Sequence, residues 1–173
     1  NQQEPSVAVD SLGNAMVVWT SFGQDGDQNG VYGRTLDTAG SLGGSELTVA
    51  TTSAASQDHA KVRTSRAGSR FIVTWTDEAA DGDRQSVMAR AYSGGAFTDT
   101  DLVINTTTAG RQMLSDVAYA SASKEAVLVW QGGLRKASTG GADSDEYGIY
   151  TASASLEDLT PPNAVCQNIE VVL

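Results

Sequence analysis

Apolar residues recur along the chain in short runs, and the three most apolar runs each contain a tryptophan. These runs are NAMVVWTS (14–21), RFIVTWTD (70–77) and EAVLVWQG (125–132). Trp19, Trp75 and Trp130 are therefore spaced 56 and 55 residues apart. A fixed period of this size is typical of repeat proteins in which each repeat is one supersecondary unit.

The first run indicates how such a segment would pack. Side chains alternate between the two faces of a strand, so Val17 and Trp19 share one face while Met16 and Val18 share the other. Apolar residues on both faces predict a strand that is covered on both sides.

Other segments repeat with the same period. The segment after each tryptophan run reads GVYGRTLD (30–37), SVMARAYS (86–93) and GIYTASAS (148–155). LTVATTSAASQ (47–57) aligns with LVINTTTAGRQ (102–112). Gln2, Gln57 and Gln112 also fall in register, each ahead of a short strand-like segment. The chain therefore contains three repeats of about 55 residues.

Each repeat is predicted to hold four strands, separated by clusters of Gly, Asp and Ser. The first strands are SVAVD (6–10), AKVRT (60–64) and SDVAY (115–119), and the fourth strands are ELTVATT (46–52) and DLVINTT (101–107). No stretch shows helical periodicity. The chain is therefore predicted to be all-β.

Four antiparallel strands per repeat, with the second covered on both faces, predict β-propeller blades. The expected blades span 1–56, 57–111 and 112–160. A β-trefoil and a β-prism are the alternatives with three repeats. Pro161 and Pro162 cannot donate to a strand ladder, so the last blade is expected to lack its fourth strand. Since propellers have four to eight blades, further blades are expected upstream in a longer polypeptide.

Charge and composition exclude some classes of function. The chain has 11 Lys and Arg against 21 Asp and Glu, a formal charge of −10, which argues against binding nucleic acid. It has no apolar run long enough to insert into a membrane. Cys166 is the single cysteine, so no disulfide can form within these residues.

The loop GQDGDQNG (23–30) raises the question of a metal site, because Asp25, Asp27 and Asn29 alternate as oxygen ligands do in calcium loops. The acidic pair recurs between the second and third strands of the other repeats. The recurring residues are Asp81 and Asp83 in the second repeat, and Asp143 and Asp145 in the third. Asp, Asn and Gly are also the residues of tight turns, and recurrence at one position favours that role. Calcium stays open as the one candidate cofactor, with the first loop as its best site.

Catalytic residues are not evident in the sequence. His59, the only histidine, is interpreted as a surface residue beside Asp58, and no G-x-S-x-G motif exists. Tyr32 and Tyr150 are candidates for stacking on sugar rings, whereas the tryptophans are expected in the core. We therefore predict no catalytic residues and a protein that is not an enzyme.

The stretch PSVAVDSLGNAMVVWTSFGQDGDQNGVYGRTLD (5–37) resembles the tandem repeats of very large secreted bacterial proteins of the surface or adhesin type. Those repeats are taken to be propeller-like, and the resemblance extends over residues 4–155, with a degenerate loop in the last repeat. The tail TPPNAVCQNIEVVL (160–173) resembles the start of a hyalin-repeat-type immunoglobulin-like domain. The resemblance therefore implies a linker and the first strand of such a domain over 161–173.

This resemblance implies a non-catalytic module of a secreted or cell-surface protein, with a role in adhesion or as a structural spacer. Export by the type IX route of Bacteroidetes is implied as well. The implied partners are surface glycans or other proteins, the upstream blades and the downstream immunoglobulin-like domain. The alternatives are a glycan-active propeller enzyme of the sialidase or glycosidase type, with its active site supplied by upstream blades, and a carbohydrate-binding module.

Overall fold

The computed structural model describes residues 1–173 apart from 66–69, 98–99, 121–124, 136–144, 156–164 and 168–173. All regular elements of the described residues are strands, and the strand pairings among them are antiparallel. The predicted all-β class is confirmed.

Repeat one forms the first sheet, whose strands pair in chain order. They are β1 (Gln2–Val9), β2 (Ala15–Phe22), β3 (Asn29–Leu36) and β4 (Leu42–Thr48). Asp10 and Asp37 shape the turns after β1 and β3, because each side chain accepts hydrogen bonds from the backbone N–H groups two and four residues later.

Repeat two forms the second sheet, in the order β5-β6-β7-β8, with β9 also paired to β7. These strands are β5 (Gln57–Thr64), β6 (Phe71–Asp77), β7 (Ser86–Ser93), β8 (Ala96–Phe97) and β9 (Leu102–Val103). The fourth strand predicted at 101–107 is thus shorter than expected, and β8 shares its place beside β7.

Repeat three forms the third sheet, in the order β10-β11-β12-β13. These strands are β10 (Arg111–Ala120), β11 (Glu125–Arg135), β12 (Asp145–Ser155) and β13 (Val165–Gln167). β13 pairs with Thr151–Ser153 of β12, so the expectation that this repeat lacks a fourth strand is wrong. Pro161 and Pro162 remove hydrogen-bond donors only at their own positions, and the residues of β13 keep theirs. Val165–Gln167, which the tail resemblance assigns to a following domain, lies at the edge of the third sheet.

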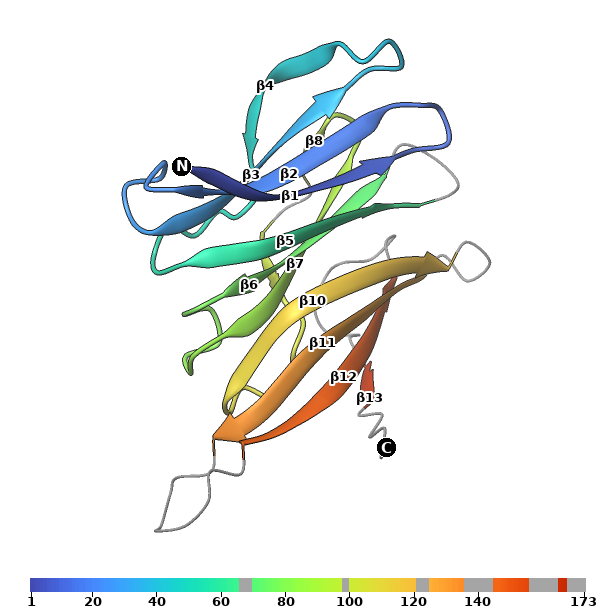
Figure 1. Ribbon diagram of the computed structural model, residues 1–173. Helices are drawn as coiled ribbons and strands as arrows, with labels where there is room; N and C mark the ends of the chain where they lie inside the picture. Colours follow the sequence, from blue (N-terminus) through green and yellow to red (C-terminus); the bar gives the residue numbers. More distant parts are fainter. Residues whose placement is uncertain (66–69, 98–99, 121–124, 136–144, 156–164, 168–173) are drawn as a thin grey trace.

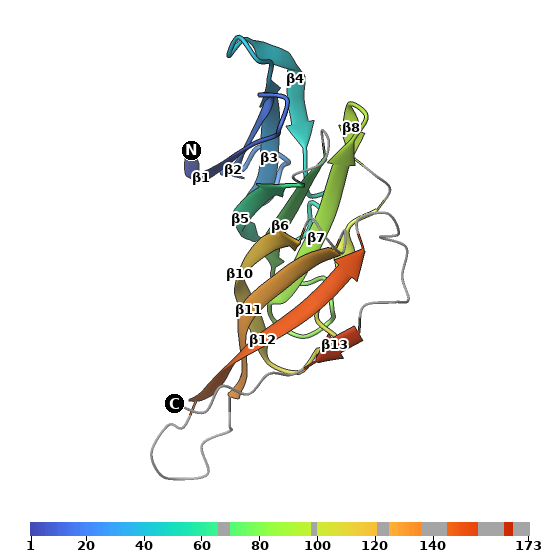
Figure 2. The same cartoon turned by 90° about the vertical axis from the view of Figure 1, so that its right-hand side faces the viewer.

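The three sheets stack face to face (Figure 1), and Figure 2 shows their first strands along one edge of the stack and their last strands along the other. We call the edge formed by β1, β5 and β10 the first-strand edge; β5 contacts both of its neighbours there. The sheets do not close into a ring within the described residues.

Two apolar cores hold the stack together. The core between the first and second sheets includes Met16, Val62 and Trp75, and the core between the second and third sheets includes Ile72 and Trp130. Every residue of β6 is buried, because its two faces belong to different cores. The prediction of a strand covered on both sides is confirmed for β6 in the second sheet. It rests on the run that forms β2, and there it is wrong within the described residues, because Met16 and Val18 lie in a core but Val17 and Trp19 do not.

Candidate functional site

The loops between the second and third strands of the first two sheets carry predicted site residues, and one aspartate of each loop binds the next repeat. Asp27 Oδ2 accepts a hydrogen bond of 3.0 Å from the backbone N–H of Ala55, shortly before β5. Asp83 Oδ2 accepts one of 2.9 Å from the backbone N–H of Gly110, just before β10. One position of the repeat therefore ties each loop to the start of the following sheet. We call these two contacts the loop clamps.

The other aspartate of each loop shapes the turn. Asp25 Oδ1 and Asp81 Oδ1 each accept a hydrogen bond of 3.2 Å from the backbone N–H two residues later. Gly26 and Gly82 lie between them with φ of 98° and 86°, a conformation that glycine adopts without strain. This is the geometry of an Asx turn.

The fit of these loops to calcium depends on the other oxygen atoms that could act as ligands. Asn29 Nδ2 donates a hydrogen bond of 3.0 Å to Ser56 Oγ. Asp143 lies outside the described residues. Asp145 is the first residue of β12, and only its backbone is described. In the described part of the chain, no three His, Cys, Asp or Glu side chains converge as a metal site. Two carboxylates per loop, each bonded to an N–H, fall short of the six to eight oxygens that calcium takes. The described loops do not fit the ion by themselves, and calcium stays a prediction.

A second cluster lies on the first-strand edge, where each first strand contains a β-bulge. The ladder register shifts between Gln3 and Ser6 in β1, and the same shift occurs in β5 and β10. Glu4, His59 and Leu114 occupy the bulges with φ of 54°, 56° and 55°. Side chains other than glycine rarely adopt this backbone conformation, and such strain often marks a functional position.

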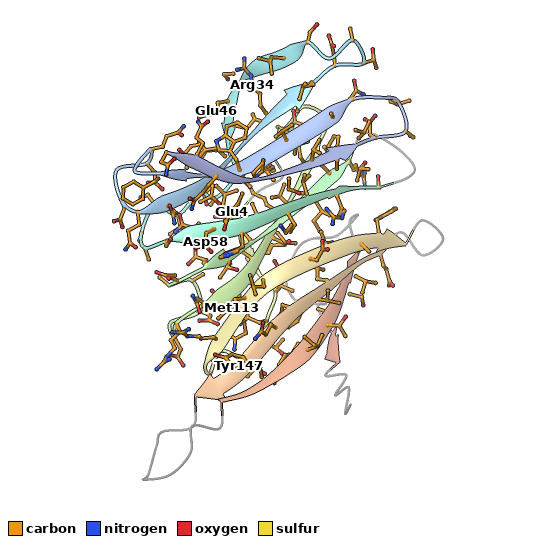
Figure 3. The ribbon with its side chains drawn as sticks, viewed as in Figure 1. Glu4, Arg34, Glu46, Asp58, Met113 and Tyr147 are labelled. Atoms are coloured by element: carbon orange, nitrogen blue, oxygen red, sulfur yellow. The ribbon has the colours of Figure 1, made fainter. Side chains whose placement is uncertain are left out.

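The bulges bring a histidine between two carboxylates. His59 Nδ1 lies 2.6 Å from Asp58 Oδ1, and His59 Nε2 lies 3.4 Å from Glu4 Oε1. Glu4 Oε2 accepts a hydrogen bond of 3.0 Å from the backbone N–H of His59 and one of 3.2 Å from the hydroxyl of Thr20. Figure 3 labels Glu4 and Asp58 on the neighbouring strands β1 and β5. All three titratable side chains are partly exposed.

This arrangement supplies groups that can hold or move a proton, since a carboxylate beside an imidazole fixes its orientation. The described contacts of this cluster do not identify a nucleophile, so the cluster by itself does not define a reaction. Sequence analysis placed His59 beside Asp58 but missed Glu4. The available signal was the spacing of 55 residues that puts Glu4 and His59 at the same position of the repeat.

The tyrosines named as sugar-stacking candidates are packed against other groups. Tyr32 is buried, and burial raises the pKa of its hydroxyl, with a further increase from the negative charges of Asp25 and Glu46. Tyr150 stacks on Trp130 with ring centroids 6.1 Å apart. Trp75 and Trp130 are buried in the two cores, as expected for these tryptophans. Trp19, which was also expected in the core, is partly exposed and belongs to neither core.

Comparison with known proteins identifies a solved structure with a similar fold. No family model matches the chain, and no curated protein matches it. Among the described residues, no helix has the length and apolar character of a membrane span. The endo-arabinase from Bacteroides thetaiotaomicron, a β-propeller-like structure, is similar with a TM-score of 0.61 and 11% sequence identity. The similarity covers 98% of this chain and 61% of that chain, so this chain spans about three fifths of its length. At this identity the similarity shows that the two chains share a β-rich fold.

Proposed function

We propose that the chain is a set of β-propeller blades that serves as a non-catalytic module of a large exported cell-surface protein, in adhesion or as a structural spacer. The loop clamps carry this proposal. Asp27 and Asp83, the most prominent polar groups of the repeated loops, bind backbone N–H groups of the next repeat. These aspartates connect consecutive repeats to one another, and a module that resists tension or holds other domains apart requires such connections.

The blade assignment is supported by the stacking of the sheets. Each repeat forms its own sheet, and the middle sheet is covered on both faces by its neighbours. A trefoil barrel or a prism would cover one face of each sheet in a common core. The similarity to the endo-arabinase supports the same assignment.

The cellular role can be tested with antibodies raised against the chain and applied to cells that produce the natural protein. We expect labelling of intact cells, and removal of the epitope by an external protease. A cytoplasmic marker that is labelled only after permeabilisation provides the control. Labelling of the chain itself only after permeabilisation would contradict the proposal.

A glycan-active enzyme is the second candidate, because the neighbour in fold is an endo-arabinase and because Glu4, Asp58 and His59 converge on the first-strand edge. The test is release of reducing ends from arabinan and from a panel of polysaccharides. We expect no release. Activity that is lost in Glu4→Gln and Asp58→Asn, but kept in the distant exposed variant Glu125→Gln, would replace the first proposal with the second.

A further inference from the structure

The two end sheets of the stack each expose an apolar face. The leading face is the outward face of the first sheet, formed by Val7, Val9, Ala15, Val17 and Trp19. The trailing face is the outward face of the third sheet, formed by Val127, Val129, Tyr147 and Ile149. The strand pairing places the residues of each face together. On the leading face, Val7 lies opposite Val17. On the trailing face, Ile149 lies opposite Gln131, and Gln131 shares one face of β11 with Val129 because the two are two residues apart.

Residues of the leading face have equivalents in the other two repeats, and those equivalents are buried inside the stack. Val7 is 59% exposed, whereas its equivalents Val62 and Val117 are 0% and 3% exposed. Val62 packs in the core between the first and second sheets, and Val117 packs in the core between the second and third. In both cases, the leading side of one sheet is covered by the trailing side of the sheet before it.

The trailing face shows the reciprocal relationship. Ile149 is 55% exposed, whereas its equivalents Val31 and Val87 are fully buried. Val127, also exposed, corresponds to the buried residues Met16 and Ile72. The surface that covers a trailing face inside the stack is therefore the leading face of the next repeat.

The described residues form one exposed face of each kind, and each is the partner that the other lacks. We propose that the leading face of one copy binds the trailing face of a second copy, and that the reciprocal contact closes a ring of six sheets. Six lies within the four to eight blades of known propellers. Each copy contributes the same two faces, so a two-fold symmetric dimer covers the leading face and the trailing face of both copies. This inference does not depend on the proposed cellular role, but it replaces the upstream blades expected from the sequence with a second copy of the chain.

The first test is the mass of the full chain, measured by sedimentation velocity and by light scattering over about 1–100 μM, a range that covers moderate affinities. We expect a monomer–dimer equilibrium that ends at the dimer. A chain that stays monomeric throughout overturns the proposal and leaves both faces to further repeats of a longer polypeptide. Open assemblies that grow with concentration overturn the closed ring.

The second test uses one variant on each face. Val7→Asp and Ile149→Asp each place a carboxylate in both contacts of the symmetric dimer, so each is expected to weaken association by about tenfold or more, since burying an unpaired charge is costly. Leu12→Asp is the matched control, because Leu12 is 63% exposed but lies in the turn between β1 and β2. Unchanged thermal unfolding of the monomers shows that each variant still folds.

Mixing the two variants gives the sharpest outcome. In a mixed dimer, one contact carries both aspartates and the other contact carries neither, so association is expected to recover in part. A dimer that joins two leading faces would instead respond to Val7→Asp alone, without recovery on mixing. Either that pattern or equal behaviour of all three variants would overturn the proposal.

Discussion

The carboxylate of Asp27 and the backbone N–H of Ala55 lie 28 residues apart in the chain, and the hydrogen bond between them joins one repeat to the next. Asp83 and Gly110 form the same contact one repeat later. Ala55 and Gly110 both have positive φ, 63° and 89°. The loop clamp therefore requires an aspartate on one side and a left-handed backbone on the other, whatever side chain that residue carries.

Removing a clamp should destabilise the stack to a modest extent. Asp27→Ala is expected to lower the free energy of unfolding by about 0.5–1.5 kcal/mol, the range of a hydrogen bond near the surface. Asp83→Ala should have a similar effect, and the two losses should add because the sites are far apart in the repeat array. Asp27→Asn keeps an oxygen acceptor and serves as the control. Equal stability of wild type and the double alanine variant in urea unfolding would show that the clamps contribute nothing.

We expect that the loops do not bind calcium by themselves. Asp25, Asp27, Asp81 and Asp83 each place an oxygen against a backbone N–H, which leaves few of the ligands that calcium requires. We expect no heat of binding in a calorimetric titration and no change in melting temperature on adding calcium or a chelator. A saturable signal that Asp25→Asn abolishes would establish the first loop as a calcium site.

The repeat period and the two-faced second strand predicted much of the fold. The spacing of Trp19, Trp75 and Trp130 located the three sheets. The apolar run around Trp19 predicted a strand covered on both faces, which is found at the equivalent strand β6, whereas β2 itself has one partly exposed face. The fourth strand of the last sheet was missed, because Pro161 and Pro162 forbid ladder donors locally but say nothing about Val165–Gln167.

The candidate site was less predictable than the fold. The acidic loops were found from their composition, but the partners of Asp27 and Asp83 depend on how consecutive sheets stack. The cluster of Glu4, Asp58 and His59 depends on β-bulges, which add a residue to one strand and re-aim its side chains. Hydrophobic periodicity does not reveal a bulge in these strands, because the apolar positions resume after it.

Ala55, whose N–H donates the hydrogen bond of the first clamp, has a strained backbone, and a substitution should relieve this strain. Ala55 has φ of 63°, which costs an L-residue about 1–2 kcal/mol, whereas Gly110 occupies the equivalent position without this cost. Ala55→Gly is expected to stabilise the protein by about 0.5–1 kcal/mol, because the relief of strain exceeds the added flexibility of the unfolded chain. Ala54→Gly, one residue earlier, adds the same flexibility and should destabilise. Denaturant unfolding measures both, and destabilisation by Ala55→Gly would show that the left-handed backbone is not strained there.

The buried carboxyl group of Asp77 should make stability depend on pH. Burial raises the pKa of this group above 3.8, although hydrogen bonds from Ala79, Ala80 and Gln57 act in the opposite direction, and the charge of Asp101 raises it further. Above the raised pKa the group is ionised in both states, and the folded state bears the cost of a buried charge. As the pH falls through the raised pKa, the folded state takes up a proton before the unfolded state does, so this group's contribution to stability rises until the pH is below 3.8.

Asp77→Asn isolates this contribution, because asparagine keeps an oxygen that can accept the hydrogen bond of 2.8 Å from Ala79 but carries no charge. The free energy of unfolding of wild type relative to the variant should increase on acidification, by about 1.4 kcal/mol for each tenfold increase in the proton affinity of the folded state. Urea unfolding of both proteins from neutral pH to below pH 3.8 measures this difference, and the other carboxylates cancel because they are common to both. A difference that is constant with pH would show that folding does not shift the pKa of Asp77, and one that favours wild type as the pH rises would show that the buried carboxylate is stabilised; either result contradicts the prediction.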